Sequence, residues 1–424
     1  MDSMRYMVEE MHVDGFRLDL ATSLARVKQE FSQSSGFLMS LRQDEVLQLV
    51  KIAAEPWDVG IGGYQLGAFP PGSMEWNDRY RDVTRRFWRG DERQVGELAS
   101  RLSGSSDIFG PSHRTIWSTV NYLTVHDGMT LNDLVSYNHK HNYANGEDNR
   151  DGTDANWSYN SGVEGFTENK EIVENRKLRQ RAMMSTLLLS FGTPIIRSGD
   201  EFLNTQFGNN NAYCQDNSIG WIDWRGLRRN ASMLAFVKKA VALRKAHPVL
   251  HMSESMKEAD YLGKGFPDMS FHGERAWFCN MENTSRMIGV MLCGAYAKLP
   301  DGSEDDFLYT GYNFHWETRD IALPNLPEGM EWKKVMDTGD LTCDGFYGEN
   351  GQVYERAVEV GPRTVVVLQG VKKPEPERKH TGKGKKNEKL PGAEAKKTAA
   401  SDNTVTEAEN KERRSGDNAS MASL

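Results

Sequence analysis

Strand-like segments alternate with helix-like segments through residues 1–247, and this alternation constrains the fold more than any other feature. Strands are predicted by the apolar runs at 13–20, 51–55, 119–127 and 195–201. Helices are predicted by the runs at 4–11, 44–50 and 179–190. Because strands that are separated by helices usually pair in parallel, we expect an α/β fold with a parallel sheet.

Short β-type runs replace this alternation beyond residue 247. They are AWFCNM (276–281), MIGVMLC (287–293), FLYTGYNF (307–314) and TVVVLQ (364–369). Turn residues separate them, so residues 248–370 are predicted to form an all-β sandwich domain. Residues 371–424 contain no Phe, Trp or Tyr and are rich in Lys and Glu. This composition predicts a disordered tail, for which a solvating role is favoured over binding to an anionic surface.

The overall composition argues against several classes of protein. A net charge of −8 gives no reason to expect a nucleic-acid partner. No apolar run is long enough to span a membrane, and the N-terminus does not resemble a signal peptide. The four cysteines show no CxxC spacing, which argues against a metal site or a disulfide framework. We therefore expect a protein of the reducing cytoplasm.

The strand predicted at 13–20 carries two charged side chains. Alternation along a strand places Arg17 and Asp19 on one face, and Phe16 and Leu18 on the other. Charged side chains on a buried strand must be paired or functional. On this segment alone, a structural ion pair and a functional pair fit equally well.

Glu55 stands at the end of the strand predicted at 51–55, where Pro56 stops regular pairing. The carboxyl ends of parallel strands are where α/β barrels place their catalytic groups. Trp57 follows directly, and a carboxyl group beside indole surface has its pKa raised by desolvation. Glu55 is therefore a candidate general acid, and the alternative is a surface glutamate at a strand end.

His126 and Asp127 end the next predicted strand. The alternatives are a helix N-cap for Asp127 and a structural role for His126. Asp19, Glu55 and Asp127 nevertheless place a carboxylate at each of three strand ends. Two carboxylates that flank a glycosidic bond are what retaining glycoside hydrolysis requires, and a third can stabilise positive charge on the sugar.

Three segments in this order, DGFRLDLA (14–21), AEPWD (54–58) and TVHDG (124–128), resemble the catalytic segments of the α-amylase superfamily of glycoside hydrolases. Longer segments, at 54–70, 192–224 and 311–327, resemble the isoamylase-type glycogen debranching enzymes of that superfamily. The resemblance runs from about residue 4 to residue 370. It implies retaining hydrolysis of α-1,6-glucosidic branch linkages in glycogen, limit dextrin or another branched α-glucan.

The resemblance also assigns a role to each matching residue. It makes Asp19 the nucleophile, Glu55 the general acid and then base, and Asp127 the group that stabilises the oxocarbenium-like transition state. Arg17 would hold Asp19 ionised, and His126 would hydrogen-bond the sugar at the point of cleavage. The residues expected to line the cleft are Trp57, Asp58 and Tyr64.

Neither an organic cofactor nor a metal is expected, because two carboxyl groups and water suffice for this reaction. The segment at 148–156 (DNRDGTDAN), which we call the oxygen-rich loop, lacks the DxDxDG spacing of a calcium loop. A hydrogen-bonded loop is therefore favoured there over a calcium site. The sequence leaves the oligomeric state open.

The family fold is an eight-stranded (β/α)8 TIM barrel, and residues 1–247 match only about strands 4–8 of it. The family's N-terminal sandwich and first three barrel strands have no counterpart in this sequence. We therefore expect an incomplete barrel, followed by the sandwich domain and the tail, as a truncated part of a debranching enzyme. The alternatives are a non-catalytic α-glucan-binding or regulatory subunit and a relative with another specificity, such as α-1,4 hydrolysis.

Overall fold

A five-stranded parallel sheet dominates the first part of the computed structural model, which describes residues 1–374. Its strands, in spatial order, are β1 (Gly15–Leu18), β4 (Lys51–Ala54), β5 (Met74–Asn77), β6 (Thr119–Tyr122) and β7 (Thr193–Ile195). Every neighbouring pair is parallel, so all five carboxyl ends meet at one edge. A small hairpin, β2 (Arg26–Val27) and β3 (Glu30–Phe31), follows β1.

Helices occupy most of the connections between these strands. They are α2 (Ala21–Leu24), α3 (Gly36–Gln43), α4 (Asp78–Arg89), α5 (Val95–Leu102), α6 (Ser106–Phe109), α7 (Leu131–Leu134) and α8 (Lys170–Leu189). Helix α1 (Asp2–Glu9) precedes β1, and α9 (Gly226–Arg229) and α10 (Ala231–Ala246) follow β7. Single 3-10 turns lie at Leu47–Leu49, Gly110–Ser112, Ile116–Ser118, Tyr143–Asn145, Asp200–Phe202, Ala212–Cys214, Pro248–Leu250, Gly294–Tyr296 and Gly348–Asn350. Among residues 1–374, no helix has the length and apolar character needed to cross a bilayer.

Side chains at the helix ends explain why α4 and α8 begin where they do. The Asn77 side chain accepts a hydrogen bond from the Tyr80 N–H at the start of α4. The Asn169 side chain accepts hydrogen bonds from two N–H groups at the start of α8. Such N-caps satisfy amides that have no partner within the helix. Gly90 ends α4 in the left-handed conformation, at a φ of 102°, which glycine adopts without strain.

The C-terminal part of the described chain is antiparallel. Its six-stranded sheet has the order β13 (Val353–Tyr354), β12 (Met330–Asp337), β15 (Thr364–Lys372), β10 (Leu308–Asn313), β9 (Met287–Leu292) and β8 (Met269–His272). A second sheet pairs β11 (Arg319–Ala322) with β14 (Ala357–Val360). Tyr309 and Val366 of the large sheet and Ile321 and Val358 of the small one share a buried cluster. The all-β character predicted for this part is confirmed.

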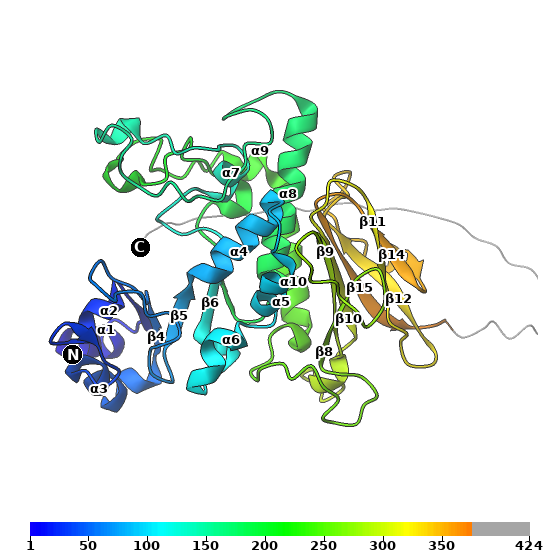
Figure 1. The fold of residues 1–424 in the computed structure, drawn as a ribbon, viewed down its shortest axis with the longest axis horizontal. Coiled ribbons are helices and arrows are strands. Elements are labelled where there is room, and N and C mark those ends of the chain that lie inside the picture. Colours follow the sequence, from blue (N-terminus) through cyan, green and yellow to red (C-terminus); the bar gives the residue numbers. More distant parts are fainter. Residues whose placement is uncertain (375–424) are drawn as a thin grey trace, which may run out of the picture. The chain divides into compact units, whose positions relative to one another are not determined.

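One hydrophobic cluster joins the helices to this β structure. It includes Phe87 of α4, Leu187 of α8, Phe236 of α10, and Phe314 and Val365 beside or within the large sheet. The rings of Phe87 and Phe314 lie 3.8 Å apart between centroids. Figure 1 shows α4, α5, α8 and α10 between the parallel sheet and the antiparallel strands. Residues 1–374 thus pack as one unit, and the division at 247/248 into two domains stays a prediction.

Two elements predicted from the sequence are wrong. The helix expected at 44–50 is a single 3-10 turn at Leu47–Leu49. The Asp44 side chain caps its start by accepting hydrogen bonds from the N–H groups of Val46 and Leu47, but the turn does not continue because β4 begins at Lys51 and pairs with β1. The strand expected at 276–281 is a tight turn. Trp277 there has a φ of 64°, and its N–H donates to His272 Nδ1.

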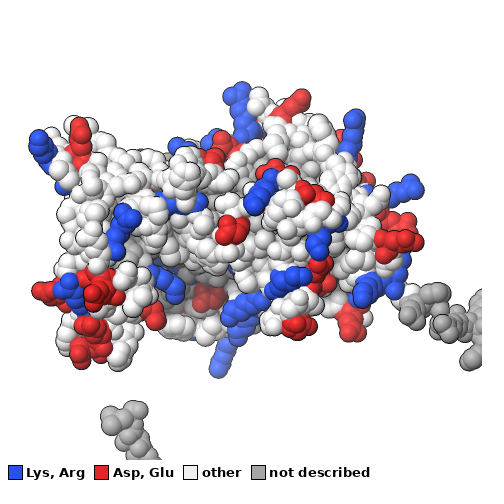
Figure 2. All heavy atoms as spheres, turned by 90° about the horizontal axis from the view of Figure 1, so that it is seen from below, with Lys and Arg blue, Asp and Glu red and all other residues white. Residues whose placement is uncertain are grey.

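The predicted tail also begins too early. Strand β15 continues to Lys372, two residues into the segment expected to be disordered from 371 onward. The rest of that segment, 375–424, lies outside the described residues. On the face shown in Figure 2, Lys and Arg side chains are interspersed with Asp and Glu.

Candidate active site

Arg17 connects two of the predicted carboxylates at the carboxyl edge of the parallel sheet. Its Nη1 lies 2.6 Å from Asp19 Oδ1, and its Nη2 lies 3.0 Å from Glu55 Oε1. The guanidinium group also lies over the Trp76 ring, 4.5 Å from the centroid. The positive charge of Arg17 is therefore shared by the two side chains that glycoside hydrolysis would need.

Asp19 lies beyond the end of its strand. Strand β1 stops at Leu18, and Leu20 adopts the left-handed conformation at a φ of 40°. The alternation predicted across 13–20 therefore ends before Asp19, and its side chain leaves the sheet with 71% of its surface exposed. The ion pair with Arg17, rather than a position on the same strand face, orients this carboxylate.

Glu55 follows β4 directly and is buried. Its backbone N–H donates to the Leu18 carbonyl at 3.0 Å, and the Leu20 N–H donates to Glu55 Oε2 at 2.8 Å. Burial raises the pKa of Glu55, and the neighbouring charge of Asp19 adds to this effect. The Leu20 N–H and Arg17 act in the opposite direction. A carboxyl group whose pKa is raised keeps its proton to higher pH, as a general acid must.

His126 and Asp127 lie in the loop that follows β6. The strand predicted to reach Asp127 ends at Tyr122. His126 Nε2 lies 3.2 Å from Asp127 Oδ2, and both side chains are more than half exposed. The helix that follows, α7, is capped by Thr130, so the alternative role of Asp127 as its N-cap is wrong.

A cleft of about 500 Å³ lies along this edge, and we call it the main cleft. Glu55 and Asp127 both line it, and so do Trp57, Tyr64 and Trp76. A second cavity of about 490 Å³ shares Trp76, Val125 and Asp127 with the main cleft and adds His126, Arg197 and Tyr213. Arg17 and Asp19 line neither space, and they reach the site through the contacts of Arg17 with Glu55 and Trp76.

Two of the three residues predicted to line the cleft do so. Trp57 lines it, and Tyr64 lines it with its hydroxyl donating to Asp78 Oδ1 at 2.8 Å. Asp58 instead accepts two hydrogen bonds of 2.7 Å from Arg26. This Arg26 contact is the main reason why the pKa of Asp58 lies below its usual range. The structure thus places the Asp58 carboxylate in a scaffold ion pair rather than in the cleft lining.

Several residues of the main cleft have no counterpart in the sequence prediction. Trp76 belongs to β5, and its ring lies 5.7 Å from that of Tyr122 and 6.0 Å from that of His126. Asp78 and Arg81 of helix α4 also line the cleft. The sequence feature that could have identified these residues is the short segment MEWND (74–78), which joins a strand to a helix at one edge of the sheet.

Hydrogen bonds hold the oxygen-rich loop in place. Asp151 Oδ2 accepts from the side-chain amides of Asn145 at 2.7 Å and Asn211 at 2.9 Å. The buried Lys140 side chain lies 2.9 Å from Asp154 Oδ1 and donates to carbonyl oxygens of the same loop. The ammonium group of Lys140 therefore provides positive charge to the oxygens of this segment.

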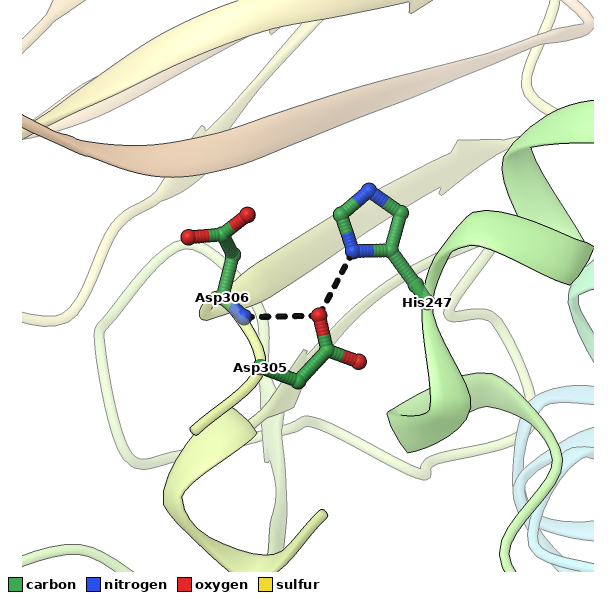
Figure 3. Close-up of side chains that lie close together, drawn as sticks. All are labelled: His247, Asp305 and Asp306. Carbon is green, nitrogen blue, oxygen red and sulfur yellow. Dashed lines mark hydrogen bonds and ion pairs between the residues drawn. The ribbon is translucent and has the colours of Figure 1, made fainter. Parts of the chain in front are cut away.

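His247, Asp305 and Asp306 form a second cluster of polar side chains, drawn in Figure 3. Asp305 accepts at one oxygen from His247 Nδ1 and from the Asp306 N–H, both at 2.7 Å, and at the other from the Val249 N–H at 2.8 Å. The Asp306 carboxylate accepts from the Gln369 side chain at 2.7 Å. These protein contacts explain the cluster as the anchor that ties the end of α10 to the large sheet.

Known proteins resemble this chain in sequence. It is 43% identical over 360 residues to the glycogen operon protein GlgX homolog of Mycobacterium tuberculosis, a match that covers 81% of this chain and 49% of the relative. It is 48% identical over 336 residues to the glycogen debranching enzyme of an Enterobacter species, which covers 78% of this chain and 47% of the relative. The chain is a homologue of bacterial glycogen debranching enzymes. It spans about half the length of these curated relatives.

Solved structures resemble the fold. The pullulanase from Bacillus acidopullulyticus matches with a TM-score of 0.62 at 22% identity, over 87% of this chain and 39% of that one. The pullulanase type I from Bacillus subtilis, complexed with maltose, matches with a TM-score of 0.61 at 20% identity, over 87% and 45%. No protein-family model matches the chain. The likeness to pullulanases shows that the parallel sheet follows the α-amylase type of barrel fold.

Proposed function

We propose that this chain carries the reaction centre of a retaining glycoside hydrolase that cleaves α-1,6-glucosidic branch linkages in glycogen, limit dextrin or a related α-glucan. The observation that carries the proposal is Arg17, which contacts both Asp19 and Glu55 at the edge of the main cleft. The names of the relatives, glycogen debranching enzymes, support the choice of linkage.

In the proposed reaction the carboxylate of Asp19 attacks the anomeric carbon while Glu55 donates its proton to the leaving glycosidic oxygen. The resulting glycosyl-enzyme is then hydrolysed by a water molecule whose proton returns to Glu55, which restores both groups. The exposed carboxylate of Asp127 would stabilise positive charge on the sugar ring, and His126 beside it would hydrogen-bond a hydroxyl group. No cofactor enters this scheme.

The finer description of the fold belongs to the same proposal. We infer that the five parallel strands correspond to strands 4–8 of an eight-stranded barrel, which their order and their likeness to pullulanases support. We also propose a cytoplasmic location and a branched α-glucan as the partner. The rival function is a glucan-binding or regulatory subunit without turnover.

The test is the release of linear malto-oligosaccharides from glycogen limit dextrin by the purified protein. We expect Asp19→Asn and Glu55→Gln each to abolish release, because each removes a group that one chemical step requires. Glu45→Gln is the matched control, since its side chain is exposed and lies on a different segment from Asp19 and Glu55. Full activity in either Asp19→Asn or Glu55→Gln would refute the assigned roles.

Turnover and binding are measured on the same preparations. Retention of the unmodified protein on glycogen, with no reducing sugar released, would favour the glucan-binding alternative. Release of reducing ends from linear α-1,4 chains, with branch points left intact, would favour another specificity. Analysis of the products by linkage distinguishes these two results.

A further inference from the structure

A separate cavity of about 500 Å³ lies in the antiparallel part of the chain and shares no lining residue with the main cleft. We call it the β-region cavity. The turn at 273–280, the segment at 284–287 that leads into β9, and the residues around β11 form its walls. The proposed glycoside hydrolysis uses none of these residues, so their chemistry needs another explanation.

Basic groups outnumber acidic ones in the lining of this cavity. Arg275, Arg286 and Arg319 contribute guanidinium groups, and Glu274 contributes the one carboxylate among the described lining residues. The Arg275 side chain makes no hydrogen bond or ion pair within residues 1–374, whereas its backbone carbonyl accepts from the N–H groups of Gly273 and Phe278. The Arg275 side chain is free to meet an anion, whereas Glu317 and Glu92 partly neutralise Arg319 and Arg286 from outside the lining. The excess of guanidinium groups in the lining itself favours an anionic ligand.

The other two arginines already have partners, but neither uses its whole guanidinium group. Arg319 Nη2 lies 3.0 Å from His315 Nε2, and Arg286 Nη1 donates to the Thr284 carbonyl at 3.1 Å; His315 and Thr284 both line the cavity. The carboxylate partners of the two arginines lie outside the lining. Arg319 Nη2 lies 3.0 Å from Glu317, and Arg286 Nη2 lies 3.4 Å from Glu92. Arg286 Nε is buried and has no hydrogen-bond partner in the described part of the chain. A buried donor without a partner costs free energy, which a ligand that accepts its hydrogen bond would recover.

The local field at His315 agrees with this excess of positive charge. Burial lowers the pKa of the His315 imidazole, and Arg319, Arg286 and Arg363 lower it further, while Glu317 opposes them. The ring is packed in place, with Trp316 stacked on it at 4.0 Å between centroids. An anion beside His315 would offset the repulsion that these arginines exert on its protonated form.

The cavity also offers neutral groups that suit a sugar. Thr284, Ser285 and Asn280 line it with hydroxyl and amide groups, which can hydrogen-bond phosphate oxygens or sugar hydroxyls. Phe278 lines the same space with 58% of its surface exposed. An exposed aromatic ring of this kind can pack against the apolar face of a pyranose.

We propose that the β-region cavity binds a phosphate group, either as inorganic phosphate or as the phosphate of a small sugar. Arg275, Arg286 and Arg319 would donate to the phosphate oxygens, because the planar guanidinium fork matches two oxygens at once. A sugar carried by the phosphate would pack on Phe278. The site does not depend on hydrolysis in the main cleft.

The experiment is isothermal titration calorimetry on the full 424-residue chain with inorganic phosphate, glucose 6-phosphate and glucose, in chloride buffers of equal ionic strength. We expect phosphate and glucose 6-phosphate to bind and glucose not to bind. Tighter binding of glucose 6-phosphate than of phosphate identifies the sugar phosphate as the ligand class, and equal binding identifies free phosphate.

Variants locate the site. Arg275→Gln and Arg319→Gln should each weaken phosphate binding by about tenfold, the value of one charge-assisted hydrogen bond. Arg228→Gln on α9 is the matched control, because its side chain is exposed and lies outside the cavity lining. The Arg275 side chain is exposed and makes no hydrogen bond or ion pair within residues 1–374, so Arg275→Gln should leave folding intact. Circular dichroism checks that it does.

Three results would overturn the proposal. The first is no heat of binding with either phosphate compound, and the second is binding that Arg275→Gln and Arg319→Gln leave unchanged. The third is glucose binding as tightly as glucose 6-phosphate, which would make the cavity a neutral sugar site. Debranching activity is not part of the measurement, so the failure of the proposed function and the failure of this site are separate results.

Discussion

Asp200 provides the sharpest quantitative prediction, because one buried carboxyl group holds both ends of the loop that carries His126 and Asp127. Its Oδ1 accepts from the Leu131 N–H at 2.9 Å, and its Oδ2 accepts from the Thr124 hydroxyl. The side chain is almost fully buried in the 3-10 turn that follows β7. The perturbation is Asp200→Asn, which keeps the size of the side chain and removes its charge.

The magnitude follows from the titration of this group. Burial raises the pKa of Asp200 from 3.8 to about 6, and the nearby carboxyl of Asp133 adds to this, while hydrogen bonds from Thr124 and Leu131 and the charge of Arg197 oppose it. The folded state therefore binds the proton more tightly than the unfolded state. The contribution of this bound proton to the free energy of unfolding is fully present below pH 3.8 and is lost as the pH rises through 6. The difference corresponds to about 3 kcal/mol in the free energy of unfolding.

The assay is urea denaturation of the wild-type protein and of Asp200→Asn between pH 4 and pH 7. We expect the free energy of unfolding of the wild type, relative to the variant, to fall by roughly 2–3 kcal/mol across this range. Asp133 is present in both proteins, so its own titration largely cancels. The control is Asp148→Asn, whose side chain is 89% exposed. A constant difference between wild type and Asp200→Asn would refute the reasoning.

Three further predictions concern other contacts of the structure. Arg114→Met should lower the free energy of unfolding by about 3–5 kcal/mol in urea, because it leaves the buried Glu75 carboxylate without its ion-pair partner, and an unchanged midpoint would contradict this. Arg17→Gln should move the basic limb of the activity profile to higher pH, because the positive charge that lowers the pKa of Glu55 is gone; a shift to lower pH would show that Arg17 acts differently. Lys140→Met should speed cleavage of the oxygen-rich loop by trypsin or endoproteinase Asp-N, because the loop loses an ion pair and two hydrogen bonds, and equal rates would count against that role.

The parts of the fold that local patterns control were predictable. The apolar runs that became β1, β4 and β6 were recognised, although each strand is shorter than its run. The strand predicted at 195–201 is wrong beyond Ile195, because β7 ends there and the segment ends in the 3-10 turn at Asp200–Phe202. Such runs reflect burial on both faces of a parallel sheet, which is a property of the segment itself. Strand β5 and helix α4 were missed, because a four-residue strand that passes at once into a charged helix carries little periodic signal.

The wrong elements have local causes that a pattern of apolar residues does not reveal. The segment at 44–50 has helical spacing and is capped by Asp44, but the chain enters strand β4 at Lys51, which pairs with β1 and ends the turn. The segment at 276–281 is rich in aromatic residues, but Trp277 turns the chain at a positive φ. Strand pairing outweighs helix propensity in the first segment, and a backbone turn outweighs strand propensity in the second.

The sequence by itself marked Glu55 at the end of a strand and singled out Asp19, His126 and Asp127, although it placed Asp19 within β1 and the other two at the end of β6. The structure puts Asp19 just beyond β1 and puts His126 and Asp127 in the loop after β6. Only the tertiary structure decided which of them share a charge and which face the main cleft. Asp58 follows Glu55 by three residues and yet pairs with Arg26, because the hairpin after β1 brings that guanidinium group to it. Strand order along a chain is a local property, whereas the pairing of charged side chains depends on which segments the fold brings together.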